Sequence, residues 1–171
     1  MYGTLDEREQ EFMLMIRRSI RTMRQLIDDL LDLAHIDTGL DLHLEPINIY
    51  PIIEDSVVGQ KNLAEEKKQS VLIDTPQDRP LVAGDKRRLR QILVNLVSNA
   101  IKYTPPEGRI VVSAQLLKDA IMISIADNGL GIGPEDQTQI FERFYRVRRP
   151  ETDSIEGTGL GLAIVKSLVE A

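Results

Sequence analysis

The chain has 171 residues, a formal net charge of −6 and no cysteine. An acidic chain is not expected to be a nucleic-acid-binding module, because such modules usually present a basic face. The lack of cysteine excludes disulfides and thiolate metal sites, and it fits a reducing compartment such as the cytoplasm. The sequence shows no signal peptide and no apolar run of membrane-spanning length, and its length allows one hydrophobic core with an appendage.

The first predicted element is one long amphipathic helix over residues 5–38. Acidic residues fill its first turns, and Gly39 follows its end. Its apolar residues recur at intervals of three and four: Phe12, Ile16, Ile20, Met23, Ile27, Leu30 and Ala34. At about 1.5 Å per residue the helix would span on the order of 50 Å, which is more than a core of this size needs. The stripe therefore predicts partner helices, and a surface helix folded onto its own domain is the alternative.

After the long helix, the pattern predicts a strand, a helix, a strand, a short strand, a helix, two strands, a short helix, a loop and a last helix. Their expected bounds are 41–46, 48–67, 70–75, 81–83, 85–101, 109–117, 120–126, 135–143 and, for the last helix, 159 onward. Asp85 is the expected N-cap of the helix 85–101, and Asp119 with Ala120 suits a hairpin. This order predicts an α+β fold, a two-layer α/β sandwich with a mixed, mostly antiparallel sheet packed on helices.

Two asparagines lie one helical turn apart in the predicted helix 85–101. The apolar residues around them have helical spacing, which places Asn95 and Asn99 on one face. Asparagine is a mediocre helix former, and its side-chain carbonyl is a hard oxygen ligand that suits a Mg²⁺ ion already surrounded by phosphates. Two hydrogen-bonded polar residues at the edge of a core are the alternative, which the pair alone favours.

Two glycine clusters follow. Residues 127–133 come directly after an apolar strand, and residues 157–162 open the last predicted helix. Glycine lets the backbone approach a ligand closely, and a glycine turn at a helix start presents free N–H groups to phosphate. Neither cluster has the spacing of a dinucleotide fingerprint or a Walker loop. Between them, residues 140–156 combine aromatic side chains with several arginines, which suits either a lid over a polyphosphate or a solvated basic loop.

These elements, in this order, resemble the catalytic ATP-binding domain of bacterial sensor histidine kinases of two-component systems. Residues 95–103 resemble the N box of that family, 127–131 its G1 box, 141–144 its F box and 157–161 its G2 box. The resemblance runs from about Thr4 to the last residue. Four motifs in the correct order and spacing are far more specific than any one of them, and they imply a Bergerat-type (GHKL) ATP site.

The resemblance assigns ligands of ATP and Mg²⁺ residue by residue. Asp127 would accept a hydrogen bond from the exocyclic amine of adenine, where guanine carries a carbonyl. Asn99 is the implied Mg²⁺ ligand, with Asn95 beside it as a second candidate. Lys102 would contact phosphate as a point charge, and Arg146 in the lid would neutralise charge on the γ-phosphate. The other implied nucleotide-binding residues are Tyr103, Gly129, Gly131, Ile132, Phe144, Gly157, Thr158, Gly159, Leu160 and Gly161.

Asn95 also distinguishes between reactions. Related ATPases of this fold carry a glutamate at that position, which activates water, whereas an amide cannot take a proton from water. Asn95, Lys102 and Arg146 are therefore expected to serve transfer of the γ-phosphate to a protein histidine rather than hydrolysis. A non-catalytic ATP-binding or dimerisation module, and a serine kinase or ATPase of the same superfamily, are the alternatives.

Neither of the two histidines, His35 and His43, lies in the phosphoacceptor motif of the family, so we expect ATP binding without autophosphorylation. Residues 1–39 resemble the second helix of the dimerisation and phosphotransfer hairpin, without the first helix. Residues 40–171 resemble the ATP-binding domain without its C-terminal strands. The expected partners are a second copy through the long helix and a cognate response regulator. Contact with a membrane is expected only through absent parts of a parent protein whose kinase portion is cytoplasmic.

Overall fold

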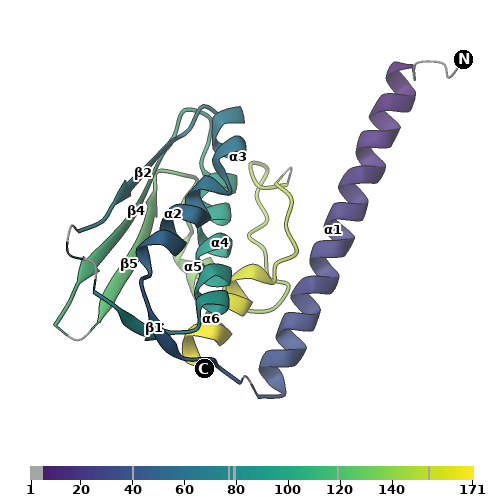
Figure 1. Ribbon diagram of the computed structural model, residues 1–171. Helices are drawn as coiled ribbons and strands as arrows, with labels where there is room; N and C mark the ends of the chain where they lie inside the picture. Colours follow the sequence, from purple (N-terminus) through teal and green to yellow (C-terminus); the bar gives the residue numbers. More distant parts are fainter. Residues whose placement is uncertain (1–5, 40, 77, 79, 119, 154) are drawn as a thin grey trace, which may run out of the picture.

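The computed structural model describes residues 6–39, 41–76, 78, 80–118, 120–153 and 155–171, and it shows one long helix beside an α/β domain (Figure 1). Among these residues, no helix is both long enough and apolar enough to cross a membrane. In chain order the elements are α1 (Glu7–Asp37), β1 (Glu45–Ile47), α2 (Tyr50–Val58), α3 (Lys61–Glu66), β2 (Ser70–Asp74), β3 (Val82–Gly84), α4 (Lys86–Tyr103), β4 (Arg109–Leu116), β5 (Ile121–Asp127), α5 (Pro134–Gln137) and α6 (Gly161–Glu170).

Helix α1 begins at a capping box and is largely exposed. The amide N–H of Glu9 donates to Asp6 Oδ1 at 2.8 Å, and the amide N–H of Asp6 donates to Glu9 Oε2 at 2.9 Å. The predicted start at Leu5 lies outside the described residues. Phe12 and Ile20 are 63% and 61% exposed, whereas Leu33 near the other end is 3% exposed. The N-terminal part of α1 therefore stands apart from the domain, and its last turns pack against it (Figure 1).

The strands form a three-stranded mixed sheet and a separate two-stranded ladder. In the larger sheet, β4 lies between β2, which is parallel to it, and β5, which is antiparallel. Strand β1 pairs with β3 antiparallel. The two-layer α+β fold with a mixed sheet is confirmed. The predicted strand 41–46 instead begins at Glu45, and the exposed His43 lies before it, where its amide N–H donates to Asp85 Oδ2 at 3.1 Å.

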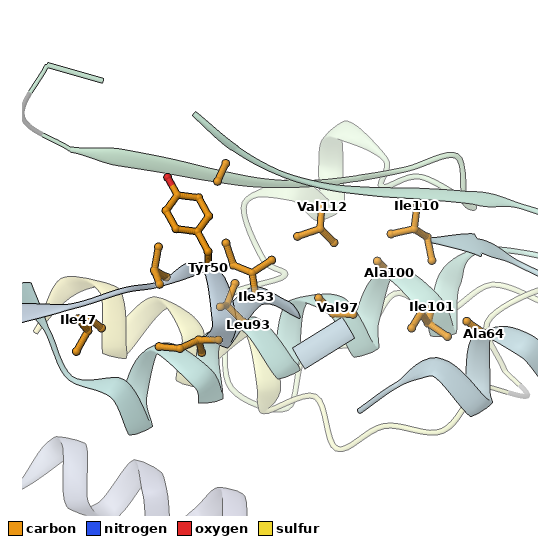
Figure 2. Packing of buried hydrophobic residues seen from close by; sticks show 13 residues of the cluster. Ile47, Tyr50, Ile53, Ala64, Leu93, Val97, Ala100, Ile101, Ile110 and Val112 are labelled. Carbon is orange, nitrogen blue, oxygen red and sulfur yellow. The ribbon is translucent and has the colours of Figure 1, made fainter. Parts of the chain in front are cut away.

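The main hydrophobic core lies between the three-stranded sheet and the helices α2 and α4 (Figure 2). Strand β4 alternates, so that Ile110, Val112 and Ala114 are buried and the residues between them are less so. The helical side of this core consists of Tyr50, Ile52, Ile53, Leu93, Val97, Ala100 and Ile101. This packing fixes the face of α4 that carries the two asparagines.

Three predicted helix boundaries differ from the structure. The predicted helix 48–67 is two helices: α2 ends at Val58, with the poor helix former Gly59 as its C-cap, and α3 begins at Lys61. The predicted helix 135–143 is regular only over Pro134–Gln137 and then continues as hydrogen-bonded turns. The last helix begins at Gly161 rather than 159, because Gly159 has a left-handed φ of 73° that no helix residue adopts.

Candidate functional site

Helix α4 is the platform of the site, and Asp85 starts it as predicted. The Oδ1 atom of Asp85 accepts from the amide N–H groups of Arg87 at 2.9 Å and Arg88 at 3.1 Å. These backbone donors hold the pKa of the Asp85 carboxyl below its usual value, and the hydrogen bond from Arg88 has the largest effect. Asn95 and Asn99 follow on this helix and are half-buried. In the part of the chain that the structure describes, neither amide side chain has a hydrogen-bond partner, which argues against the alternative of a satisfied polar pair.

The C-terminal end of α4 is held by two residues that the sequence analysis did not identify. The ammonium of Lys67 donates to the carbonyls of Ile101 at 2.9 Å, Lys102 at 2.8 Å and Thr104 at 3.1 Å. The side-chain amide of Gln69 donates to the Thr104 carbonyl at 2.6 Å and to that of Ile101 at 3.1 Å. Carbonyls at a helix C-terminus lack partners within the helix, so these donors stabilise the turn that carries Lys102 and Tyr103.

The first glycine cluster is joined to this end of α4. The amide N–H of Leu130 donates to the Tyr103 carbonyl at 3.1 Å, and the amide N–H of Gly129 donates to Asp127 Oδ1 at 2.9 Å. A Cβ atom at Gly129 would lie 2.6 Å from the Tyr103 carbonyl oxygen, so only glycine fits there. Gly131 has a left-handed φ of 66° with open space around it. Asp127, Gly131 and Ile132 are exposed on this loop.

The second glycine cluster lies against the middle of α4. A Cβ atom at Gly161 would lie 3.6 Å from Asn95 Oδ1, which places the start of α6 beside the asparagine face. Gly159 packs on the backbone of Phe144, whose amide N–H donates to the Gly159 carbonyl at 2.9 Å. Phe144 itself has a left-handed φ of 65°, which is uncommon for a bulky residue. The F-box and G2-box segments are therefore tied to each other.

Two cations lie beside this loop. The guanidinium of Arg146 donates to the carbonyls of Gly157, at 3.1 Å, and Ile155, so in this structure it shapes the loop instead of pointing only outward. Burial lowers the pKa of the Lys102 ammonium; the negative charge of Asp29 opposes that shift, and the positive charge of Arg146 adds to it. Arg146 thus contacts the loop that leads into α6, and the Asn95 face lies beside the start of that helix.

Helix α1 also reaches this loop. The hydroxyl of Thr158 donates to Asp29 Oδ2 at 2.7 Å, and Asp29 is 5% exposed. Asp29 was not among the predicted site residues. A signal was available in its spacing, because Leu26, Leu33 and Ile36 pack with α6, and Asp29 occupies the remaining position of that seven-residue pattern. An acidic residue within an apolar stripe calls for a partner.

A groove of about 790 Å³ lies elsewhere on the domain, between β3, the start of α4, the end of β4, the start of β5 and the end of α6. Its lining is mostly apolar, including Leu44, Leu81, Leu89 and Val169, and none of the predicted nucleotide-binding residues lines it. Its chemistry does not suit the phosphates of a nucleotide, so the candidate site remains the α4 face and the two glycine loops.

Known proteins match this arrangement. Two curated relatives are each 37% identical: the non-motile and phage-resistance protein of Caulobacter vibrioides, over 99% of this chain and 21% of its own length, and the adaptive-response sensory kinase SasA of Gloeothece citriformis, over 91% and 39%. The crystal structure of full-length ShkA in complex with AMPPNP superposes with a TM-score of 0.80 and 29% identity, over 98% of this chain and 35% of that one.

The chain spans between about a fifth and two fifths of the length of the curated relatives it matches. Residues 84–171, just over half of the chain, match the family described as histidine kinase-, DNA gyrase B- and HSP90-like ATPase. The match begins one residue before the N-cap of α4 and includes all four motifs. The predicted resemblance is confirmed, and the chain belongs to the family of histidine kinase-, DNA gyrase B- and HSP90-like ATPases, alongside sensor histidine kinases.

Proposed function

We propose that this chain is the ATP-binding catalytic region of a sensor histidine kinase, which binds Mg-ATP and presents its γ-phosphate to a histidine on a segment outside the chain. The observation that carries the proposal is the face of α4 that presents Asn95 and Asn99, whose amides have no hydrogen-bond partner among the described residues, with the glycine turn at Gly161 beside Asn95. Family membership and the nucleotide analogue named for full-length ShkA support it.

In this proposal the adenine binds at the loop after β5. Asp127 ends that strand and accepts a hydrogen bond from the exocyclic amine of the base. Gly129 allows the close approach of the loop to Tyr103. Gly131 and Ile132 continue the same loop. One carboxylate oxygen of Asp127 already accepts from the Gly129 amide. This bond orients the carboxylate and leaves the other oxygen for the base.

The phosphates bind between α4 and the second glycine loop. Asn99, with Asn95 beside it, would supply neutral oxygen ligands to the Mg²⁺ ion that accompanies the phosphates. Lys102 and Arg146 add positive charge, and Gly157, Thr158, Gly159, Leu160 and Gly161 bring backbone N–H groups at the start of α6. Because Arg146 also holds two carbonyls of the loop, it is proposed both to shape the lid and to face phosphate. Phe144 anchors the lid through Gly159.

The reaction follows from the side chain at position 95. Mg²⁺ would neutralise charge on the phosphates and orient them. Asn95 carries an amide that cannot accept a proton from water, so the site holds ATP for a protein nucleophile rather than hydrolysing it. His35 and His43 are not proposed as acceptors. A non-catalytic ATP-binding module is the second candidate, and the superfamily ATPase is disfavoured by Asn95.

Domain organisation and partners are proposed on the same basis. Residues 1–39 would form the second helix of a dimerisation hairpin, and residues 40–171 the ATP-binding domain. The exposed apolar side chains of α1, such as Phe12, Ile20 and Met23, would pack against a second copy. A response regulator is the proposed recipient of the phosphoryl group. The histidine kinase ThkA has been crystallised with its response regulator TrrA, and its 20% identity shows a shared fold alone.

Calorimetric titration with a non-hydrolysable ATP analogue, with and without Mg²⁺, tests the proposal. We expect saturable binding that Asp127→Asn abolishes, and we expect Asn99→Ala to remove the part that depends on Mg²⁺. The exposed Asp55→Asn on α2 and Asn62→Ala on α3 are matched controls that leave binding unchanged. A folded chain that binds no nucleotide would refute the proposal.

A second experiment separates a kinase from a non-catalytic module. The chain is mixed with a separate helix that carries a histidine in the phosphoacceptor motif, together with Mg-ATP labelled on the γ-phosphate. An acid-labile, base-stable label on the added helix supports the kinase. Binding of ATP without transfer to that helix supports the non-catalytic module, and label on the chain alone would contradict both.

A further inference from the structure

Asp29 is a buried carboxylate whose two oxygens are both engaged near the second glycine loop. It is 5% exposed. Oδ1 accepts from the side-chain amide of Gln25, one turn earlier on α1, at 2.8 Å. Oδ2 accepts from the hydroxyl of Thr158 at 2.7 Å, across 129 positions of sequence. A buried ionised group needs partners of this kind, and one of the two comes from the loop itself.

Asp29 also acts on the cations of the site. Burial lowers the pKa of the Lys102 ammonium, and the negative charge of Asp29 opposes that shift. Lys102 also feels the positive charge of Arg146, which holds the carbonyls of Gly157 and Ile155. The contact that joins the carboxylate to the groups we propose for the phosphates is its hydrogen bond from Thr158 at 2.7 Å.

Further contacts attach the loop region to α1. Arg143 donates to both carboxylate oxygens of Asp37, at 2.7 Å and 3.0 Å, and Arg18 forms an ion pair with Glu156. Leu33 packs in a cluster with Leu160 and with Ile164 and Leu168 of α6. The loop between α5 and α6 lies beside α1 in Figure 1 (the yellow-green segment). The two segments are thus joined at several points, and the contact of Asp29 is with Thr158 in the second glycine cluster.

We propose that Asp29 is a positioning residue that lowers the affinity of the site for nucleotide phosphates while α1 is docked, because it occupies the hydroxyl of Thr158 and places a buried negative charge against the second glycine loop. The proposal rests on the proposed function, and it concerns regulation of the same site. A hydroxyl has one proton to donate, so Thr158 cannot donate to Asp29 and to a phosphate at once. The carboxylate and the phosphates also repel each other and compete for the same ammonium.

This competition has a thermodynamic consequence. If docking of α1 weakens ATP binding by some factor, bound ATP weakens docking of α1 by the same factor. ATP binding would then release the loop from Asp29 and increase the freedom of α1 relative to the domain. A conformational change of the long helix would in turn change the affinity for ATP, although the helix does not contact the base.

The test compares Asp29→Asn with Asp28→Asn, using adenosine, ADP and ATP as ligands. Asparagine keeps an acceptor for Thr158 but removes the charge, and Asp28 is an exposed neighbour on the same helix. We expect Asp29→Asn to bind ATP at least about 5-fold more tightly, ADP by a smaller factor and adenosine equally, with Asp28→Asn like the unmodified chain. A merely structural role for Asp29 would change all three affinities alike.

A second measurement follows α1 directly. The chain has no cysteine, so Arg21→Cys with Asp153→Cys introduces one spin-label pair across α1 and the loop. We expect ATP to lengthen or broaden the label distance, and adenosine to leave it unchanged. Equal ATP affinities of Asp29→Asn and Asp28→Asn, or a label distance that ATP does not alter, would overturn the inference while leaving the proposed function intact. Failure of every variant to bind ATP would refute both.

Discussion

The ammonium of Lys67 allows a quantitative test of how the site is supported. Replacement by methionine keeps most of the aliphatic length and removes the charged donor. Three carbonyls at the end of α4 then lose that donor, at 2.8 to 3.1 Å in the intact protein. Gln69 still reaches the carbonyls of Ile101 and Thr104, so only the carbonyl of Lys102 is left without any of these donors.

The expected cost of Lys67→Met follows from that count. A hydrogen bond from a charged group contributes about 1.5–3 kcal/mol, and the carbonyls shared with Gln69 are replaced in part. We therefore expect the free energy of unfolding to fall by about 1.5–3 kcal/mol, which for a chain of this size lowers Tm by roughly 3–12 °C. Because Lys102 and Tyr103 lie on the affected turn, affinity for an ATP analogue should fall as well.

Thermal and urea unfolding followed by circular dichroism measures this change, with Lys61→Met as the control. Lys61 forms an exposed ion pair with Glu65 at 3.4 Å, and such pairs contribute little. The double variant Lys67→Met with Gln69→Leu should lose more stability than the sum of the losses of the two single variants. Only in the double variant do the carbonyls that the two residues share lose both donors. Equal stability of Lys67→Met and Lys61→Met would show that the capping argument is wrong.

Three further changes probe the loops, the helix start and the long helix. Gly129→Ala should abolish nucleotide binding in calorimetry, because a Cβ there meets the Tyr103 carbonyl at 2.6 Å; unchanged binding would contradict the need for this close approach. Asp85→Ala should cost about 1 kcal/mol in urea unfolding. That difference should persist above the unfolded pKa and vanish as pH falls through the lowered pKa of Asp85; persistence in strong acid would contradict the cap. Ile20→Glu should shift the chain toward monomer in sedimentation, and an unchanged association would remove α1 as the dimer interface.

The elements of the fold could largely be predicted from sequence, because the signals for them are local. The capping residue Asp85, the alternating strand β4 and the spacing of Asn95 and Asn99 are each encoded within a few neighbouring positions. Local signals failed where one long helix and two short helices would have the same apolar spacing. The apolar spacing continues through Gly59, so the break between α2 and α3 depends on a single poor helix former and on packing.

The supports of the site could not be predicted in the same way. Lys67 and Gln69 meet the end of α4 more than 30 positions later in the chain, and their own surroundings contain no sign of that role. A lysine in a loop is ordinarily solvated. Only packing of α3 and β2 beside α4 brings the donors to the carbonyls, so this knowledge had to come from the three-dimensional structure.

The same distinction explains why the motifs identify the family while the regulation lies outside them. The four boxes contain the groups that we propose to meet the nucleotide, and all lie between residues 95 and 161. Asp29 lies outside these boxes, yet it accepts from Thr158 within the last of them. If a carboxylate on another helix partly sets the affinity of the site for ATP, that affinity depends on the position of the helix, although ATP does not contact the helix. Conservation of the boxes alone would then leave the affinity for ATP free to differ between members of the family, according to the residue that α1 presents at position 29.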